Sequence, residues 1–405
     1  MKITSYIIWS LILITFLAGT TFAQAVGDYR SAVSGDWSAA ATWEVYDGTW
    51  NAASSAPTGS ETITVDGTDT VNVDTDVTIS GSVIVMETGI LDTTSGSLTF
   101  ADGSTYEHAR DGGDVPIATW ETGSTALFTG ITNNTPANRG QDYFNLTLNT
   151  AGLLSNKDMA LDGHTISGDF TVLSSGSARW RLVGGSSGTI TIMGDVIVQN
   201  GASLETQGTG SATDVIINHY GNINVTDANF SISRGSQSSG TGTTVWNLFE
   251  GDFMMSNGET RNSNPTQGNA IFVFAKSDTQ HISFTNVTYA GGDIHFKVAD
   301  TTVLVIDQDF QVNGLLMNEG AVVPMGTLTF LDGSVYDHAR DGGDVPIATW
   351  EDGSTYMLTG IVSTTPGNRN QEFYNITINT PDMTSNTRTM NPKALFRKAH
   401  KGRKG

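Results

Sequence analysis

The amino-acid sequence predicts an all-β protein, folded as a right-handed parallel β-helix (a β-solenoid) with an N-terminal cap. Three observations predict this class: a long internal repeat, a shorter period inside it, and a composition rich in glycine and strand-forming residues. The chain of 405 residues has 46 glycines, 9 prolines and no cysteine. Short alternating runs such as 61–65 are typical of strands, and no segment after the N-terminal leader has helical periodicity.

The long repeat joins two blocks, 98–150 and 328–380, which align without a gap at an offset of 230 positions. Within these 53-residue blocks, 36 positions are identical. Self-similarity on this scale is typical of architectures that propagate one structural unit. We therefore expect one β-solenoid module over 65–300 and a partial second module over 301–390.

The shorter period is marked by tripeptides of glycine, an acid or amide, and an apolar residue. They recur at a nearly constant interval, beginning at Gly168, Gly194, Gly221 and Gly251. Each opens a strand-like run, and the interval is the length of one solenoid coil that turns at glycine or asparagine. The alternative is a string of tandem β-sandwich domains, whose strands usually recur at a shorter spacing without this longer period.

The N-terminus predicts export. In residues 1–23, Lys2 precedes an apolar run, and small residues stand just before Gln24, which is the layout of a cleavable signal peptide. The apolar run is too short for a membrane span. We therefore expect an extracellular or cell-surface protein with no membrane span after cleavage, and the lack of cysteine means no disulfide framework.

The two ends of the mature chain differ from the repeats. Residues 24–64 contain Trp37, Trp43 and Trp50, and we interpret them as a cap over the exposed strand edges of the solenoid end. An aromatic platform for sugars is the alternative. Residues 391–405 form a basic tail that breaks the repeat, and we interpret it as a truncated or frameshifted end.

The charge of the chain limits its partners. The formal net charge is −21 at pH 7, which repels nucleic acids and anionic lipid surfaces. We expect no nucleic-acid partner, and extracellular glycans or surface components as partners.

The residues best suited to chemistry are Tyr106, His108 and Arg110, which recur 230 positions later. In an extended strand they share one face. A lyase acting on uronates needs a base and a cation that neutralises the carboxylate, so these three are the candidate catalytic residues. We nevertheless favour a hydrogen-bonded corner of the coil and assign no catalytic residue, because an active site is rarely copied once per structural module.

The residues best suited to a metal follow directly. Asp111 and Asp114 flank two glycines, as do Asp341 and Asp344 in the second copy. Flexible glycines could turn both carboxylates toward one calcium ion, a cation that prefers oxygen ligands. A solvated turn is the alternative, and no other cofactor is expected.

Three segments carry a family resemblance: SGDWSAAATWE from Ser34, ATWETGSTALFTGIT from Ala118 and ATWEDGSTYMLTGIV from Ala348. They resemble large secreted repeat proteins of Bacteroidota. The resemblance implies an adhesin-like or matrix protein of the parallel β-helix type at the cell surface. It implies no particular activity.

Together these observations favour a secreted structural or adhesive protein that binds glycans or surfaces without catalysis. One alternative is a polysaccharide lyase or glycoside hydrolase built on a β-helix. Another is a calcium-stabilised carbohydrate-binding module. An enzyme should have one groove with converging charged groups, whereas an adhesive protein should have regular, repeated polar outer faces.

Overall fold

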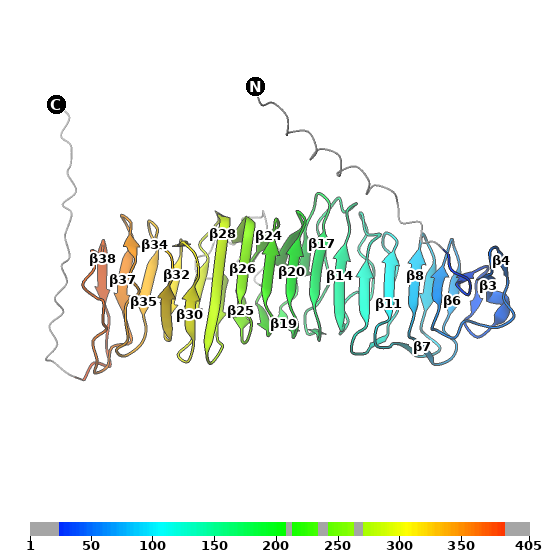
Figure 1. Cartoon of the computed structure of the whole chain (residues 1–405), viewed down its shortest axis with the longest axis horizontal. Coiled ribbons are helices and arrows are strands. Elements are labelled where there is room, and N and C mark those ends of the chain that lie inside the picture. The colour runs from blue at the N-terminus through cyan, green and yellow to red at the C-terminus, as the bar shows by residue number, and fades with distance from the viewer. Residues whose placement is uncertain (1–23, 208–212, 234–241, 263–269, 385–405) are drawn as a thin grey trace, which may run out of the picture.

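The computed structural model describes residues 24–207, 213–233, 242–262 and 270–384. They form an elongated parallel β-solenoid of about 12 turns with 1% helix (Figure 1). Its described strands pair in parallel, except in a small hairpin at the N-terminal end. The predicted fold class is confirmed, and the tandem-sandwich alternative is wrong because sandwich sheets pair antiparallel. The predicted signal peptide and basic tail lie outside the described residues.

Each coil crosses up to three faces of the solenoid, which we number in the order in which the chain meets them. Strands β26 and β28 are long enough to continue from the first face onto the second. The first face contains β1 (Tyr29–Ser31), β5 (Thr62–Val65), β8 (Ser82–Met86), β11 (Thr105–Ala109), β13 (Thr125–Phe128), β14 (Asn145–Asn149), β17 (Phe170–Ser174), β20 (Val196–Gln199), β23 (Ile223–Thr226), β26 (Phe253–Asn262), β28 (Thr279–Gly291), β30 (Val303–Ile306) and β33 (Ala321–Pro324).

The strands of the other two faces also pair in parallel with strands of adjacent coils, but in three separate runs on the second face and two on the third. The second face contains β2 (Gly35–Asp36), β6 (Thr70–Asn72), β9 (Ile90–Asp92), β15 (Lys157–Asp158), β18 (Trp180–Val183), β21 (Ser203–Gln207), β24 (Asn229–Ser231), β31 (Phe310–Val312), β34 (Leu328–Phe330) and β36 (Thr349–Trp350). The third face contains β7 (Val77–Ile79), β10 (Leu98–Phe100), β12 (Thr119–Trp120), β16 (Thr165–Ile166), β19 (Gly188–Ile192), β22 (Val215–His219), β25 (Thr244–Leu248), β27 (Ala270–Phe274), β29 (His295–Val298), β32 (Leu315–Asn318), β35 (Val335–His338), β37 (Thr355–Leu358) and β38 (Asn375–Ile378).

Coil length varies along the rod. In the middle, Phe170 pairs with Val196, and the next two coils follow the glycine tripeptides in the same way, as the sequence predicts. Toward both ends the coils are shorter. Thr105 pairs there with Thr125, and Thr355 with Asn375. The period of the tripeptides therefore describes only the central coils.

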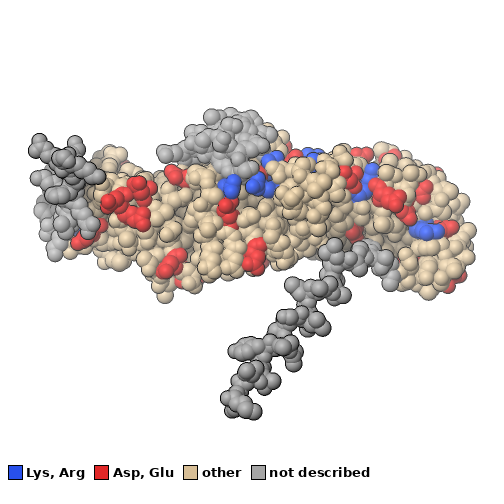
Figure 2. All heavy atoms as spheres, turned by 90° about the horizontal axis from the view of Figure 1, so that it is seen from above, with Lys and Arg blue, Asp and Glu red and all other residues tan. Residues whose placement is uncertain are grey.

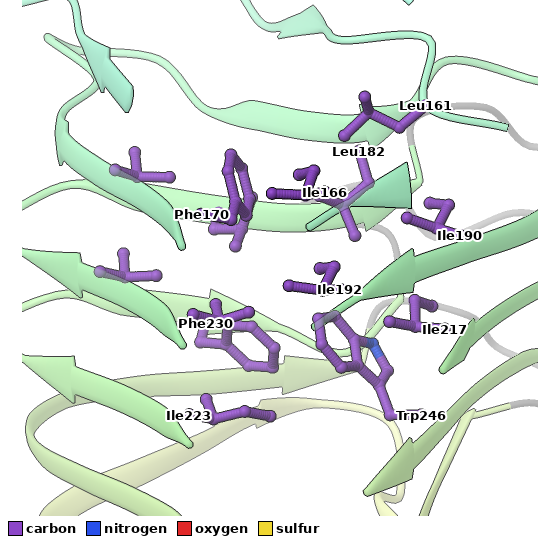
Figure 3. Packing of buried hydrophobic residues seen from close by; sticks show 14 of the residues in the cluster. Leu161, Ile166, Phe170, Leu182, Ile190, Ile192, Ile217, Ile223, Phe230 and Trp246 are labelled. Carbon is purple, nitrogen blue, oxygen red and sulfur yellow. The ribbon is translucent and has the colours of Figure 1, made fainter. Parts of the chain in front are cut away.

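The core consists of apolar side chains that stack from coil to coil inside the solenoid. Figure 3 shows Ile166, Ile192 and Ile217 in neighbouring coils, with Phe230 packed against Trp246. The rings of Phe230 and Trp246 lie 5.2 Å apart in an edge-on arrangement. Burial of each such side chain stabilises the fold by about 1.5–3 kcal/mol. The buried residues occur from the first coils to the last, so this stabilisation is distributed along the whole rod.

The glycine tripeptides form a corner whose chemistry repeats. A Cβ added at Gly194 would lie 2.4 Å from the carbonyl carbon of Gly168, so only glycine allows the coils to approach here. The next residue links the coils: Asp195 N–H donates to Oδ1 of Asp169 at 2.8 Å, and Asn222 N–H donates to Oδ1 of Asp195 at 2.7 Å. The motif therefore combines close packing with an acceptor for an otherwise unpaired N–H.

The N-terminal end differs from the coils. It contains η1 (Ala40–Thr42), β3 (Trp43–Tyr46) and β4 (Trp50–Ala52). Strand β3 pairs antiparallel with β1 and β4, and β1 pairs parallel with β5. The end of the rod is thus closed by a hairpin in place of another coil (Figure 1).

The tryptophans of this end divide into two groups. Trp37 and Trp43 are buried, their rings 5.1 Å apart, and Trp43 Nε1 donates to the Trp37 carbonyl at 2.8 Å. Trp50 is half-buried, and the Arg30 guanidinium lies 4.6 Å from its ring centre. Because two of the three rings lie in the core, they cannot form an external platform for sugars.

The two copies of the repeated block lie on different faces. In the first copy β11, β13 and β14 belong to the first face, whereas their counterparts β35, β37 and β38 belong to the third. Likewise β10 and β12 lie on the third face, and their counterparts β34 and β36 on the second. The second copy is therefore displaced by one face around the solenoid axis.

Candidate functional site

Tyr106 and His108 lie inside the solenoid. Strand β11 directs both side chains inward, and both are buried. The Tyr106 hydroxyl lies 2.8 Å from His108 Nδ1, and His108 Nε2 lies 2.8 Å from the Gly112 carbonyl. Since a carbonyl only accepts, Nε2 carries the proton and donates to Gly112, and Nδ1 accepts from the tyrosine.

Burial fixes the protonation of this pair. It lowers the pKa of His108 to about 4, against the raising effect of the Gly112 carbonyl, and it raises the pKa of Tyr106 well above its usual value. Both groups are therefore neutral at physiological pH. A neutral, enclosed imidazole already holding both of its hydrogen bonds is poorly suited to take a proton from a polymer outside.

Arg110 lies just beyond the end of β11. Its Nη1 donates to the Gly89 carbonyl in the preceding coil. The guanidinium packs over Gly113, where an added Cβ would lie 2.4 Å from Cζ and where φ is +77°. The arginine thus links two coils and is not grouped with Tyr106 and His108 at an open surface.

Asp111 anchors the following coil. Its Oδ1 accepts the main-chain N–H groups of 132–134, each at 2.8 Å, and its Oδ2 accepts Asn134 Nδ2 at 2.7 Å. Burial opposes ionisation, but these bonds outweigh it and lower the pKa of Asp111 to about 2. The carboxylate therefore serves as the anion for a cluster of backbone N–H groups.

The second copy repeats this arrangement. Tyr336 hydroxyl lies 3.1 Å from His338 Nδ1, and His338 Nε2 donates to the Gly342 carbonyl at 2.7 Å. Burial raises the pKa of Tyr336 and lowers that of His338. Asp341 Oδ1 accepts the N–H groups of 362–364 at 2.7–2.9 Å, which holds its pKa well below the usual value.

The second aspartate of each pair is exposed. Asp114 forms a parallel bridge with Ala137, and Asp344 forms one with Gly367. Within the part of the chain that the structure describes, no group of three or more histidines, aspartates or glutamates is placed to hold a metal ion. The calcium site stays a prediction. The carboxylate oxygens of Asp111 and Asp341 already accept hydrogen bonds from the following coil.

Sequence reasoning missed a groove of about 790 Å³ next to the second copy. One wall is β33 and the other is the segment 343–349, with Arg340 and Asn368 also in the lining. The sequence repeat groups Arg340 with Tyr336 and His338. The structure shows that Arg340 lines the groove, whereas Tyr336 and His338 are buried inside the solenoid.

The outer surface carries acidic side chains along the rod, and on the face seen in Figure 2 basic ones are few. One half-exposed aromatic pair lies after the third face: the Tyr220 and Phe249 rings stack 5.1 Å apart at an interplanar angle of 28°. The described residues include no helix that is long and apolar enough to cross a membrane.

A scan against protein-family models and searches of the curated proteins and of the solved structures found no match for this chain.

Proposed function

We propose that this chain is a secreted structural or adhesive β-solenoid that binds glycans or surface components along its outer faces without catalysis. One observation carries the proposal. In both copies, the tyrosine and histidine that could perform acid–base chemistry are buried and hydrogen-bonded to each other and to a backbone carbonyl. Neither copy offers these groups to a polymer outside.

The outer faces support a binding role because they carry asparagines that pair between neighbouring coils. Asn247 Nδ2 donates to Asn218 Oδ1 at 3.0 Å, and Asn286 Nδ2 donates to Asn257 Oδ1 at 3.1 Å. Neighbouring coils lie about 4.8 Å apart, so a long polymer can meet several equivalent contacts. Several weak contacts in a row increase the overall affinity without one strong site.

The Tyr220–Phe249 pair provides an apolar surface beside this polar one. Stacked rings on an outer corner can contact the C–H face of a sugar, while amides and carboxylates bind its hydroxyls. Asn222, which follows Tyr220 closely in the chain, belongs to the corner ladder because its N–H donates to Asp195 of the preceding coil. We propose this corner as one of the repeated contact surfaces.

The export of the chain is also part of the proposal. Residues 1–23 have the layout of a signal peptide. The likeness to Bacteroidota surface proteins points to the same compartment. N-terminal sequencing of the secreted protein should begin near Gln24, and recovery of the intact leader in the cytoplasm would contradict export.

The test is glycan-array binding by the full chain, with and without a calcium chelator, together with reducing-end and unsaturated-product assays on the same polysaccharides. We expect binding without turnover. Turnover that His108→Ala abolishes would overturn the proposal in favour of a lyase or hydrolase. Binding lost both on chelation and in Asp111→Ala would favour the calcium-stabilised carbohydrate-binding module.

A further inference from the structure

The groove beside the second copy exists because the ladder on the first face ends at β33 within the described residues. The chain next crosses this region in 343–348, which lines the opposite wall without pairing with β33. The resulting volume of about 790 Å³ falls in the range of small-molecule sites, roughly 300–1,000 Å³.

Arg340 lines this groove and is half-buried. It packs against Gly343, where an added Cβ would lie 2.8 Å from its Cζ. Among the described residues its guanidinium has no hydrogen-bond or ion-pair partner, although Asp344 lines the same groove. Its counterpart Arg110 instead donates to the Gly89 carbonyl. In the second copy, therefore, the Arg340 guanidinium has N–H donors that are available to a ligand in the groove.

The remaining walls combine apolar and polar groups. Ile347 and Val323 are 62% and 41% exposed, whereas Thr327, Thr349 and Asn368 supply exposed hydroxyl and amide groups. A sugar ring presents an apolar C–H face and a rim of hydroxyls, so this mixture of side chains suits an oligosaccharide.

The backbone of the groove is less suited to an extended peptide. The N–H groups of Ala321 and Met325 donate to the preceding coil, so alternation turns the backbone nitrogens of Val322 and Pro324 toward the groove. Pro324 has no N–H, and Pro346 stands on the opposite wall. A peptide that added itself to this edge would find few of the backbone donors that strand addition requires.

We infer that this groove binds a short oligosaccharide carrying a carboxylate or sulfate group, with Arg340 as the contact for that anion. The inference rests on the proposed glycan-binding function and assigns it a site and a ligand charge. The acidity of the whole chain acts weakly at this distance, because physiological salt screens charges beyond about 8 Å. The lining contains two charged residues, Arg340 and Asp344, and of these only the guanidinium attracts an anion, so the preference for an anionic ligand depends on Arg340.

The test measures the affinity of the full chain by calorimetry for tetragalacturonate, a sulfated carrageenan tetrasaccharide and neutral cellotetraose. The two anionic probes separate carboxylate from sulfate, and we expect tighter binding of at least one of them than of cellotetraose. Arg340→Gln should weaken that binding about tenfold or more, since a hydrogen bond to a charged group is lost. Arg110→Gln is the matched control and should leave the affinity unchanged.

The outcomes separate this inference from the proposed function. If glycans bind on the array but Arg340→Gln binds the anionic probes as tightly as the parent, the inference is wrong and the proposed function stands. If no glycan binds at all, both fail. If a glutamate-rich peptide binds through Arg340 more tightly than either anionic sugar, the occupant is a peptide and the inference is overturned. Circular dichroism spectra that match the spectrum of the parent show that the variants are folded.

Discussion

The two copies of the repeated block, 98–150 and 328–380, use the same hydrogen bonds on different faces of the solenoid. In each copy a buried tyrosine and histidine are hydrogen-bonded to each other, and the histidine also to a glycine carbonyl. An aspartate accepts hydrogen bonds from three N–H groups of the next coil. Yet β11 lies on the first face and β35 on the third. The corner is therefore a self-contained unit that both the first and the third face accommodate.

The copies differ in what surrounds that unit. Arg110 is tied to Gly89, whereas Arg340 lines a groove without a partner among the described residues. Tyr143 donates from its hydroxyl to the Arg139 carbonyl at 2.7 Å, and the corresponding Phe373 has no hydroxyl. An unchanged arginine thus makes different contacts in the two copies, and one changed residue removes a hydrogen bond that the first copy has.

The largest effect should come from removing the buried tyrosine of either copy. Tyr106→Ala and Tyr336→Ala should each lower the free energy of unfolding by about 3–5 kcal/mol, because a large buried side chain is lost and a histidine loses its donor. Urea denaturation followed by circular dichroism measures both. Equal losses support a self-contained corner, and a loss in only one copy would contradict it.

A smaller effect should follow from Gly113→Ala and Gly343→Ala. Both glycines have positive φ, +77° and +71°, and a side chain there costs about 1–3 kcal/mol. The added Cβ would also press on Arg110 or Arg340. Because Arg110 is held by Gly89 and Arg340 can move into the groove, the loss in melting temperature should be greater at position 113. A greater loss in melting temperature at position 343 than at position 113 would contradict the explanation that Arg340 can move into the groove.

The aspartates predict a pH dependence. The pKa of Asp111 is about 2 in the folded chain, below the ordinary value of 3.8. A depressed pKa means that its stabilisation is present above about pH 4 and is lost as the pH falls toward 2. Asp111→Asn should therefore flatten the melting-temperature profile between pH 4 and pH 2, with Asp114→Asn as control. A profile unchanged by Asp111→Asn would show that the N–H cluster does not hold an anion.

The smallest effect should distinguish the two arginines. Arg110→Gln should cost about 1 kcal/mol, because a hydrogen bond to the Gly89 carbonyl is lost. Arg340→Gln should change the free energy of unfolding by less than about 0.5 kcal/mol, as a surface change does. Paired denaturation curves measure the difference, and a larger cost at Arg340 would mean that its guanidinium has a structural partner.

The fold class was predictable because two features of the chain repeat along it. The glycine tripeptides mark the central coils, since close packing at Gly194 and the acceptor at Asp169 both require particular residue types. The shorter end coils were missed, although a signal exists: Gly103-Ser-Thr recurs at Gly123-Ser-Thr. In the structure Thr105 and Thr125 are paired neighbours.

Other features could not be predicted from the residues. The partners of Asp111 are backbone N–H groups in the following coil, far ahead in the chain, and almost any residue type supplies such a group. The displacement of the second copy by one face depends on the summed lengths of all intervening coils. The groove at Arg340 depends in turn on that displacement, so neither has a local sequence signature.

The central claim is that the repeated tyrosine–histidine pairs are enclosed structural groups, and histidine modification tests it most directly. Treatment of the folded chain with diethyl pyrocarbonate, followed by peptide mass spectrometry, should leave His108 and His338 unreacted. The side chains of His164 and His281, 33% and 40% exposed, serve as internal controls and should react. Modification of His108 and His338 at the rate of these controls would contradict the claim and make both copies candidate active sites again.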